Sequence, residues 1–343
     1  MVCRFDPEQT CELALSKQTL DNLEKSHSND HLPVLCDEVV RLLVTDSQGA
    51  YVDGTFGRGG HTAAVLAALE PQGRVIGLDR DLDAVAHAQS LCEADHRLQI
   101  AHAEFGEIRR VLDGLQLSEV QGVLLDLGVS SPQLDNAHRG FSFLRDGPLD
   151  MRMNQTAGVT AAEWLNSAEE DDISRVLRSL GEERFARKIA RAIVHARPLQ
   201  TTLELADIVQ QAVPGQSGKH PATRTFQAVR MHINNEMGEL EAGLIAAFNA
   251  LAVGGRLAII TFHSLEDRLV KQTYRKLSTP PQLPRRLPVS QDNIAPPLAR
   301  KIAGPLRASP AEVLVNPRAR SASLRVIERA SEKPFQWGER GQG

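Results

Sequence analysis

Two residue patterns alternate between residues 50 and 129, and this alternation constrains the fold more than any other feature of the chain. Short apolar segments at residues 50–53, 74–79, 98–101 and 122–129 are typical of buried strands. Segments of helical periodicity lie between them, at residues 62–69, 82–92 and 108–115. Strands that alternate with helices in this way predict an α/β fold with a doubly wound parallel sheet.

The alternation then stops, and the next segment typical of a buried strand is residues 256–262. A structureless loop of that length is improbable, so a folded insertion is expected. The patterns between residues 159 and 213 are helical, which predicts an inserted helical subdomain at residues 136–225. We therefore expect an N-terminal extension (1–30), a main domain built from residues 31–135 and 226–330, and a tail (331–343).

The last part of the main domain has two further features. Residues 277–310 are rich in proline and arginine, and we expect no regular secondary structure there. Residues 311–317 and 321–329 predict a hairpin that completes the sheet.

The formal net charge of −4 conceals an asymmetry along the chain. Residues 1–255 carry a net charge of −13, and residues 256–329 carry +9. A basic segment can bind a polyanion even in an acidic protein, because binding depends on the local potential. On charge alone, a solvated basic surface remains the more common interpretation.

Several classes of protein are disfavoured. No apolar run approaches the length of a membrane span, so we expect no membrane association. The first thirty residues lack the pattern of a secretory signal, and the four cysteines form no C-x-x-C pair. We therefore expect a cytoplasmic protein with reduced thiols and no bound metal.

A glycine-rich segment, DGTFGRGGH at residues 53–61, lies between the first predicted strand and the first predicted helix. Glycine permits positive φ and lets a ligand approach the backbone closely. The dinucleotide fingerprint G-x-G-x-x-G fits poorly, since Thr62 would stand at the third glycine position. Asp79 ends the second strand, where a carboxylate can accept both hydroxyls of a ribose.

Other motifs are more specific, above all DLGVSSPQ at residues 126–133 and TFHSLEDR at residues 261–268. With HLPVLCDEVV, GPLDMRM, HPATRTFQAVRMHIN and NPRARSASLRV, they make the sequence resemble the bacterial 16S rRNA (cytosine-N4) methyltransferases from His31 to Glu328. The resemblance implies a Rossmann-like class I fold, with an all-helical substrate-recognition insertion, that uses S-adenosylmethionine. It further implies transfer of a methyl group to N4 of a decoding-centre cytosine, position 1402 of 16S rRNA, in the small ribosomal subunit.

By position, the resemblance implies seven cofactor-binding residues: Gly59, Gly60, His61, Asp79, Phe105, Asp126 and Gln133. In the loop after the fourth strand, Ser130 and Ser131 are candidates to accept a hydrogen bond from the cytosine amine. His263, after the fifth strand, is a further candidate to orient the base or take its proton. A structural role remains open for each of these three.

Basic residues on three segments are candidates for an RNA-docking face. They are Arg139, Arg145, Arg184, Arg187, Lys188, Arg191, Arg285, Arg286, Arg300, Lys301, Arg318 and Arg320. Three other functions stay open at this point: a ribosome-assembly factor that binds the cofactor without turnover, an NAD(P)-dependent dehydrogenase, and a methyltransferase that acts on protein or DNA. The sequence leaves the oligomeric state open, a homodimer included.

Overall fold

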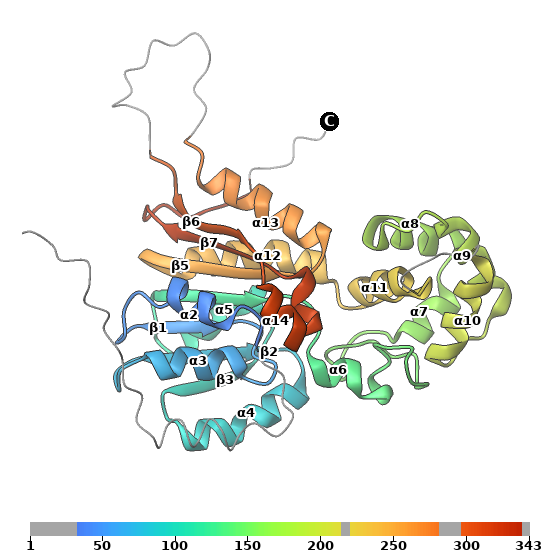
Figure 1. Ribbon diagram of the computed structural model, residues 1–343, viewed down its shortest axis with the longest axis horizontal. Coiled ribbons are helices and arrows are strands. Elements are labelled where there is room, and N and C mark those ends of the chain that lie inside the picture. The colour runs from blue at the N-terminus through green and yellow to red at the C-terminus, as the bar shows by residue number, and fades with distance from the viewer. Residues whose placement is uncertain (1–32, 214–219, 281–295, 338–343) are drawn as a thin grey trace, which may run out of the picture. The chain divides into compact units, whose positions relative to one another are not determined.

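A computed structural model describes residues 33–213, 220–280 and 296–337. Its centre is a seven-stranded sheet with the order β3-β2-β1-β4-β5-β7-β6 (Figure 1). The strands are β1 (Ala50–Asp53), β2 (Arg74–Asp79), β3 (Leu98–His102), β4 (Val120–Asp126), β5 (Leu251–Thr261), β6 (Ala299–Leu306) and β7 (Ser323–Arg329).

The first five strands are parallel, and β7 runs antiparallel to both β5 and β6. Strand order reverses between β1 and β4, and ligands of such sheets bind beyond the carboxyl ends of the strands at this point. The predicted α/β class and its Rossmann-like class I form are confirmed.

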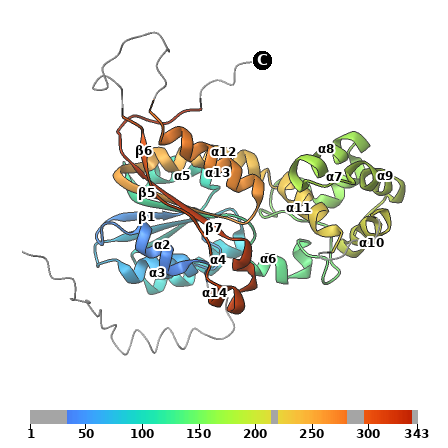
Figure 2. The ribbon, with the colours of Figure 1, turned by 45° about the horizontal axis from the view of Figure 1, so that its top comes forward.

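Helices cover both faces of the sheet, which is why β1 is buried along its whole length (Figure 2). One face packs against α2 (Cys36–Leu43), α3 (Gly60–Ala68) and α4 (Leu82–Ala94) through Val39, Leu66 and Ala88. The other packs against α5 (Ile108–Gly114), α12 (Glu236–Ala250) and α13 (Ser264–Leu277). Within the described residues, no helix has both the length and the apolar character needed to cross a membrane.

A second hydrophobic cluster lies among five helices between β4 and β5. They are α7 (Ala161–Ser167), α8 (Glu170–Gly181), α9 (Ala186–Ala196), α10 (Thr202–Ala212) and α11 (Ala222–Ile233). Phe226 and Val229 of α11 belong to this cluster, so the predicted boundary at residue 225 falls inside a helix that packs with the insertion. We therefore propose that the insertion extends to the end of α11.

Two expectations about the C-terminal part are wrong. The segment expected to be irregular contains the edge strand β6, which has bulges and tolerates Pro305 because an edge strand needs fewer ladder hydrogen bonds. Residues 311–317 do not form a strand: α14 (Pro310–Val315) begins where the Ser309 hydroxyl accepts a hydrogen bond from the Glu312 amide, at 3.1 Å. The outer partner of β7 is therefore β6.

Candidate active site

The glycine-rich turn after β1 lies at the carboxyl edge of the sheet. The Phe56 amide donates a hydrogen bond to the Leu78 carbonyl at 3.0 Å, which ties the turn to β2. Gly57 and Gly59 have φ angles of 55° and 76°, and a Cβ on Gly59 would lie 2.7 Å from the Phe56 ring. The backbone here therefore depends on glycine at residue 59.

Asp79 ends β2 and faces this turn. Its Oδ2 accepts a hydrogen bond from the Gly57 amide at 2.8 Å, and its Oδ1 accepts one from the Asp81 amide at 2.8 Å. Burial raises the pKa of Asp79 to about 6, against the effect of these two hydrogen bonds. The carboxylate therefore has lone pairs for a ligand at neutral pH and loses its charge in mild acid.

His61, near the start of α3, is 7% exposed and lies beside the end of β4. Its Nε2 is 3.5 Å from Oδ2 of Asp126. Burial alone lowers the pKa of His61, but Asp126, the Cys36 thiol and the charge of Asp53 outweigh it and raise the pKa to about 10. The raised pKa favours the charged imidazole. Both ring nitrogens of His61 and the buried Oδ1 of Asp126 have no hydrogen-bond partner among the described residues.

Asp53 was not among the predicted site residues, yet it anchors the same region. Its Oδ2 accepts a hydrogen bond from the Thr62 hydroxyl at 2.7 Å, and its Oδ1 accepts one from the Thr55 amide at 3.2 Å. The Thr55 hydroxyl in turn accepts a hydrogen bond from the Asp126 amide at 2.7 Å. An acid at a strand end directly before a glycine was the sequence signal available for this role.

Phe105 begins the short helix η1 (Phe105–Glu107) after β3. A Cβ on Gly243 of α12 would lie 2.1 Å from the Phe105 ring, so the ring packs directly on the helix backbone. Burial and the adjacent Glu104 raise the pKa of Glu239 to about 7, and the buried Glu239 Oε2 lacks a partner among the described residues. An aromatic face and two carboxyl groups therefore lie together after β3.

Both ends of the Gln133 amide make hydrogen bonds within the protein. It lies in α6 (Ser131–Asp135), is 5% exposed, accepts a hydrogen bond from the Ser130 amide at 3.0 Å and donates one to Asp81 Oδ2 at 2.7 Å. Asp81, which the sequence did not single out, is also bonded by Arg139 at 2.8 Å. Gln133 therefore holds the loop after β4 against the loop after β2.

The three candidate catalytic residues lie after neighbouring strands, since Asp126 of β4 pairs with Ile260 of β5. The Ser131 hydroxyl accepts a hydrogen bond from Arg318. His263 precedes α13, and its amide donates to Glu266 Oε2 at 3.1 Å. Ser130 is partly buried at the start of α6.

The basic residues proposed for RNA docking differ in their surroundings. Arg139 is 4% exposed and paired with Asp81, so the expectation that it docks RNA is wrong: its guanidinium is used inside the protein. Arg300 pairs with Glu328, and Arg191 lies 3.6 Å from Glu170. Arg285 and Arg286 lie outside the described residues.

Together these residues form a candidate site for a nucleoside. Asp79 offers acceptors for ribose hydroxyls, Phe105 offers an aromatic face, and the turn around Gly59 allows close approach to the backbone. Asp126 adds an unpaired buried oxygen beside them. No group of three or more potential metal-ligating His, Cys, Asp or Glu side chains occurs in the described part of the chain.

Comparison with known proteins shows close relatives along the chain. Three proteins named ribosomal RNA small subunit methyltransferase H are similar to it. The one from Idiomarina loihiensis is 53% identical, and the match covers 88% of this chain and 98% of the relative. The proteins from Nitrosococcus oceani and Pseudoalteromonas atlantica are each 50% identical; the matches cover 90% and 87% of this chain, and 99% and 98% of the respective relative. The family model described as the MraW methylase family matches residues 28–330. A match of that length, with relatives half identical along nearly their whole length, shows that the chain belongs to the MraW methylase family.

Proposed function

We propose that this protein transfers a methyl group from S-adenosylmethionine to N4 of cytosine 1402 in 16S rRNA. The observation that carries the proposal is the similarity to the ribosomal RNA small subunit methyltransferases along almost the whole chain. The site fits it, because acceptors for a ribose, an aromatic face and a close-approach turn occur together at the carboxyl edge of the sheet. Neither a dehydrogenase nor a factor without turnover receives comparable support.

In this proposal Asp79 accepts the ribose hydroxyls, and Phe105 lies against the adenine. Gly59, Gly60 and His61 contact the cofactor from the turn, and Asp126 contacts it from β4. The raised pKa of His61 favours a charged imidazole beside the Asp126 carboxylate. The Gln133 amide binds Asp81 and Ser130, and its second N–H and second lone pair are left for the cofactor.

The bound cofactor supplies a methyl group already activated on a sulfonium. The protein must hold the cytosine amine in line with the bond that breaks, because its lone pair is delocalised into the ring. Such positioning can lower the activation barrier by about 7–11 kcal/mol. The amine nitrogen gains the methyl and loses one proton, and an acceptor near it turns its lone pair towards the methyl.

We choose Ser130 over Ser131 for this role because it lies closer along the chain to the end of β4. The Ser131 hydroxyl binds Arg318. The Ser130 hydroxyl caps α6 by accepting from the Gln133 backbone amide, and the Ser130 carbonyl accepts from the Leu134 amide at 3.4 Å. Each Ser130 oxygen keeps a second lone pair, so either can accept from the cytosine amine. His263 follows the neighbouring strand and would orient the base from there.

The assembled small subunit is the substrate that we propose, which places the protein in the cytoplasm with the ribosomes. The target base must leave its stack to reach the methyl group. The mass of the complex between the protein and the small subunit would show whether one or two copies of the protein bind.

A methylation assay with labelled S-adenosylmethionine tests the proposal. Its substrates are small subunits and free 16S rRNA from a strain that lacks the gene. We expect label in N4-methylcytidine at position 1402. Ser130→Ala and Ser131→Ala serve as a matched pair, and only Ser130→Ala should lower turnover if the hydroxyl is the acceptor. Cofactor binding without label in either RNA would favour an assembly role, and hydride transfer from NAD(P)H would revive the dehydrogenase.

A further inference from the structure

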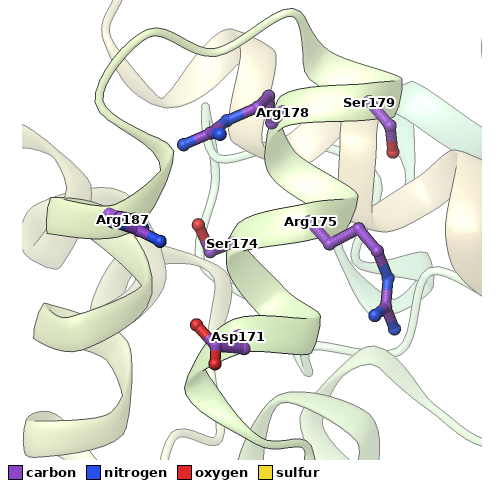
Figure 3. Close-up of a pocket in the computed structure, with 6 residues that line it drawn as sticks. All are labelled: Asp171, Ser174, Arg175, Arg178, Ser179 and Arg187. Carbon is purple, nitrogen blue, oxygen red and sulfur yellow. The ribbon is translucent and has the colours of Figure 1, made fainter.

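A hollow of about 240 Å³ lies on α8 and α9, two helices that contribute none of the candidate cofactor residues. Its lining is polar and carries several cations (Figure 3): Asp171, Ser174, Arg175, Arg178, Ser179 and Arg187. Ligand pockets of drug-like molecules are usually larger, about 300–1,000 Å³. The hollow therefore suits a small group such as a single phosphate.

Two of its three arginines have no acidic partner. Arg175 pairs with Asp172, and Figure 3 shows its side chain directed away from those of the other two. Neither the Arg178 nor the Arg187 side chain makes an ion pair or hydrogen bond with any described residue, and their guanidinium groups point to the same side of α8 (Figure 3). Two uncompensated guanidinium groups that converge in this way attract an anion.

Ser174 supplies a second, independent observation. The residue is only 5% exposed, yet its hydroxyl points towards the space between the two guanidinium groups (Figure 3). It has no hydrogen-bond partner within the described ranges, and its neighbours on this side of α8 are Asp171 and Arg178. A nearly buried hydroxyl in this position is available to donate to an oxygen of the anion.

Asp171 limits where the anion can sit. Its carboxylate lies one turn from Ser174 on the side away from Arg178 (Figure 3). Repulsion from this carboxylate favours a position near Arg178 and Arg187, and disfavours an anion spread along the whole helix.

We propose that Arg178, Arg187 and Ser174 bind one backbone phosphate of the RNA substrate. The inference rests on the proposed function, since it assigns a contact to the RNA that this protein would methylate. It differs from a diffuse basic surface because it names one phosphate and excludes Arg175, which lines the same hollow.

The test compares two variants with the wild type: Arg178→Gln together with Arg187→Gln, and the matched control Arg175→Gln. Binding to small subunits and to a 16S rRNA fragment that spans the target cytosine is measured over a range of salt concentrations. The double variant should bind about tenfold more weakly, and its slope of log affinity against log salt should fall by roughly 0.7–0.9 for the lost phosphate contact. Its KM for RNA should rise while kcat at saturating RNA and the affinity for S-adenosylmethionine stay unchanged.

The control and one further variant separate the outcomes. Arg175→Gln should change RNA affinity by less than about threefold, because its charge is already compensated by Asp172. Ser174→Ala should weaken RNA binding without changing the salt slope, because it removes no charge. A double variant with wild-type affinity and slope, or an Arg175→Gln effect of equal size, would overturn the proposal.

Methylation by the wild type separates a failure of the phosphate site from a failure of the proposed function. If the wild type labels N4-methylcytidine but the double variant binds RNA normally, only the phosphate site fails. If the wild type methylates no RNA, the proposed function itself fails. Inorganic phosphate that raises the melting temperature of the wild type but not of the double variant, with RNA binding equal in both, would identify a free-anion site and also overturn the RNA contact.

Discussion

Arg139 and Asp81 form a buried ion pair, with Nη1 2.8 Å from Oδ2 and both side chains less than a tenth exposed. The same guanidinium donates through Nη2 to the carbonyls of Arg152 and Met153. Asp81 also receives the Gln133 amide. One arginine thus joins the loop after β2 to the segment that leads into the helical insertion.

The exit from the insertion is bonded to the same region. The Asn234 side chain accepts from the Met153 amide at 2.7 Å and donates to the Met151 carbonyl at 2.7 Å. Arg80, which lies between Asp79 and Asp81, donates to the Asn234 carbonyl at 2.8 Å. The residues next to the candidate ribose-binding carboxylate therefore hold both connections to the insertion.

Replacing Arg139 with methionine should cost about 3–5 kcal/mol of the free energy of unfolding, because it leaves the Asp81 carboxylate buried and unpaired. Chemical denaturation measures this. Arg175→Met removes an exposed ion pair and should cost less than about 1 kcal/mol. Equal losses in the two variants would contradict the assigned role of Arg139.

Asp79 should make cofactor affinity dependent on pH. Its pKa is raised to about 6, so the carboxylate that accepts ribose hydroxyls is lost as the pH falls through that value. Wild-type affinity for S-adenosylmethionine should be constant above about pH 7 and fall towards tenfold per pH unit well below pH 6. Asp79→Asn should bind roughly 10–100-fold more weakly, the range expected for lost hydrogen bonds to a charged group.

Asp79→Asn should also affect stability, because the charged carboxylate that helps cofactor binding destabilises the folded state. The folded state holds the Asp79 proton more tightly than the unfolded chain does, so stability from this group is lost as the pH rises from about 4 to about 6. Asp79→Asn should therefore gain stability relative to the wild type as the pH rises from about 5 to 7. Its melting temperature at pH 7 also contains a loss, because asparagine has one acceptor oxygen for the two backbone amides of Gly57 and Asp81. Calorimetric titration between pH 5 and pH 8, with melting curves at the same values, checks both effects, and a pH-independent wild-type affinity would contradict the assignment.

Much of the fold was predictable because its first half is locally consistent. Strands β1 and β2 have the expected bounds, since each is a short apolar run with a glycine turn or polar residue at its end. The edge of the sheet was not predictable in the same way. The Gly304–Pro305 pair in β6 signals a loop by composition, and only pairing with β7 stabilises a strand there.

The candidate site shows the same division. Motifs in the sequence identified Asp79 and the glycine turn, since a strand end and a turn are local features. The role of Gln133 depends on Asp81, 52 positions away, and the burial of Arg139 depends on Asp81 and on the carbonyls of residues 152 and 153. No local pattern predicts contacts of that kind. Arg139 was therefore expected to contact RNA, whereas a contact of Gln133 with the cofactor stays a prediction.

Glu239 should lower the stability of the protein as the pH rises through neutrality. Burial and the neighbouring Glu104 raise its pKa to about 7, although Arg80 acts in the opposite direction. Because the folded state binds this proton more tightly than the unfolded state, stability is lost between about pH 4.5 and pH 7. Glu239→Gln should therefore melt close to the wild type at pH 4.5 and above it at pH 8, and a difference between the two proteins that stays the same at both pH values would contradict the raised pKa.

Replacing Gly243 with alanine should destabilise the protein and weaken cofactor binding, because the added methyl group would clash with the Phe105 ring. Alanine in a helix interior is ordinarily up to about 1 kcal/mol more favourable than glycine. Here a Cβ would lie 2.1 Å from the Phe105 ring, so the ring must move from the position in which we propose that it contacts adenine. Gly243→Ala should raise the Kd for S-adenosylmethionine, and overpacking should cost about 1–3 kcal/mol of stability.

Gly114 provides the control for Gly243→Ala, and Phe105 provides the decisive comparison. A Cβ on Gly114, the last residue of α5, meets no described atom within 4 Å. Gly114→Ala should therefore leave cofactor affinity unchanged and raise stability by at most about 1 kcal/mol. Phe105→Ala removes the ring and with it the steric conflict. If the conflict is the cause, adding Gly243→Ala to Phe105→Ala should cost no further cofactor affinity. A further loss in the double variant would mean that Gly243 acts on the cofactor by a route other than the Phe105 ring.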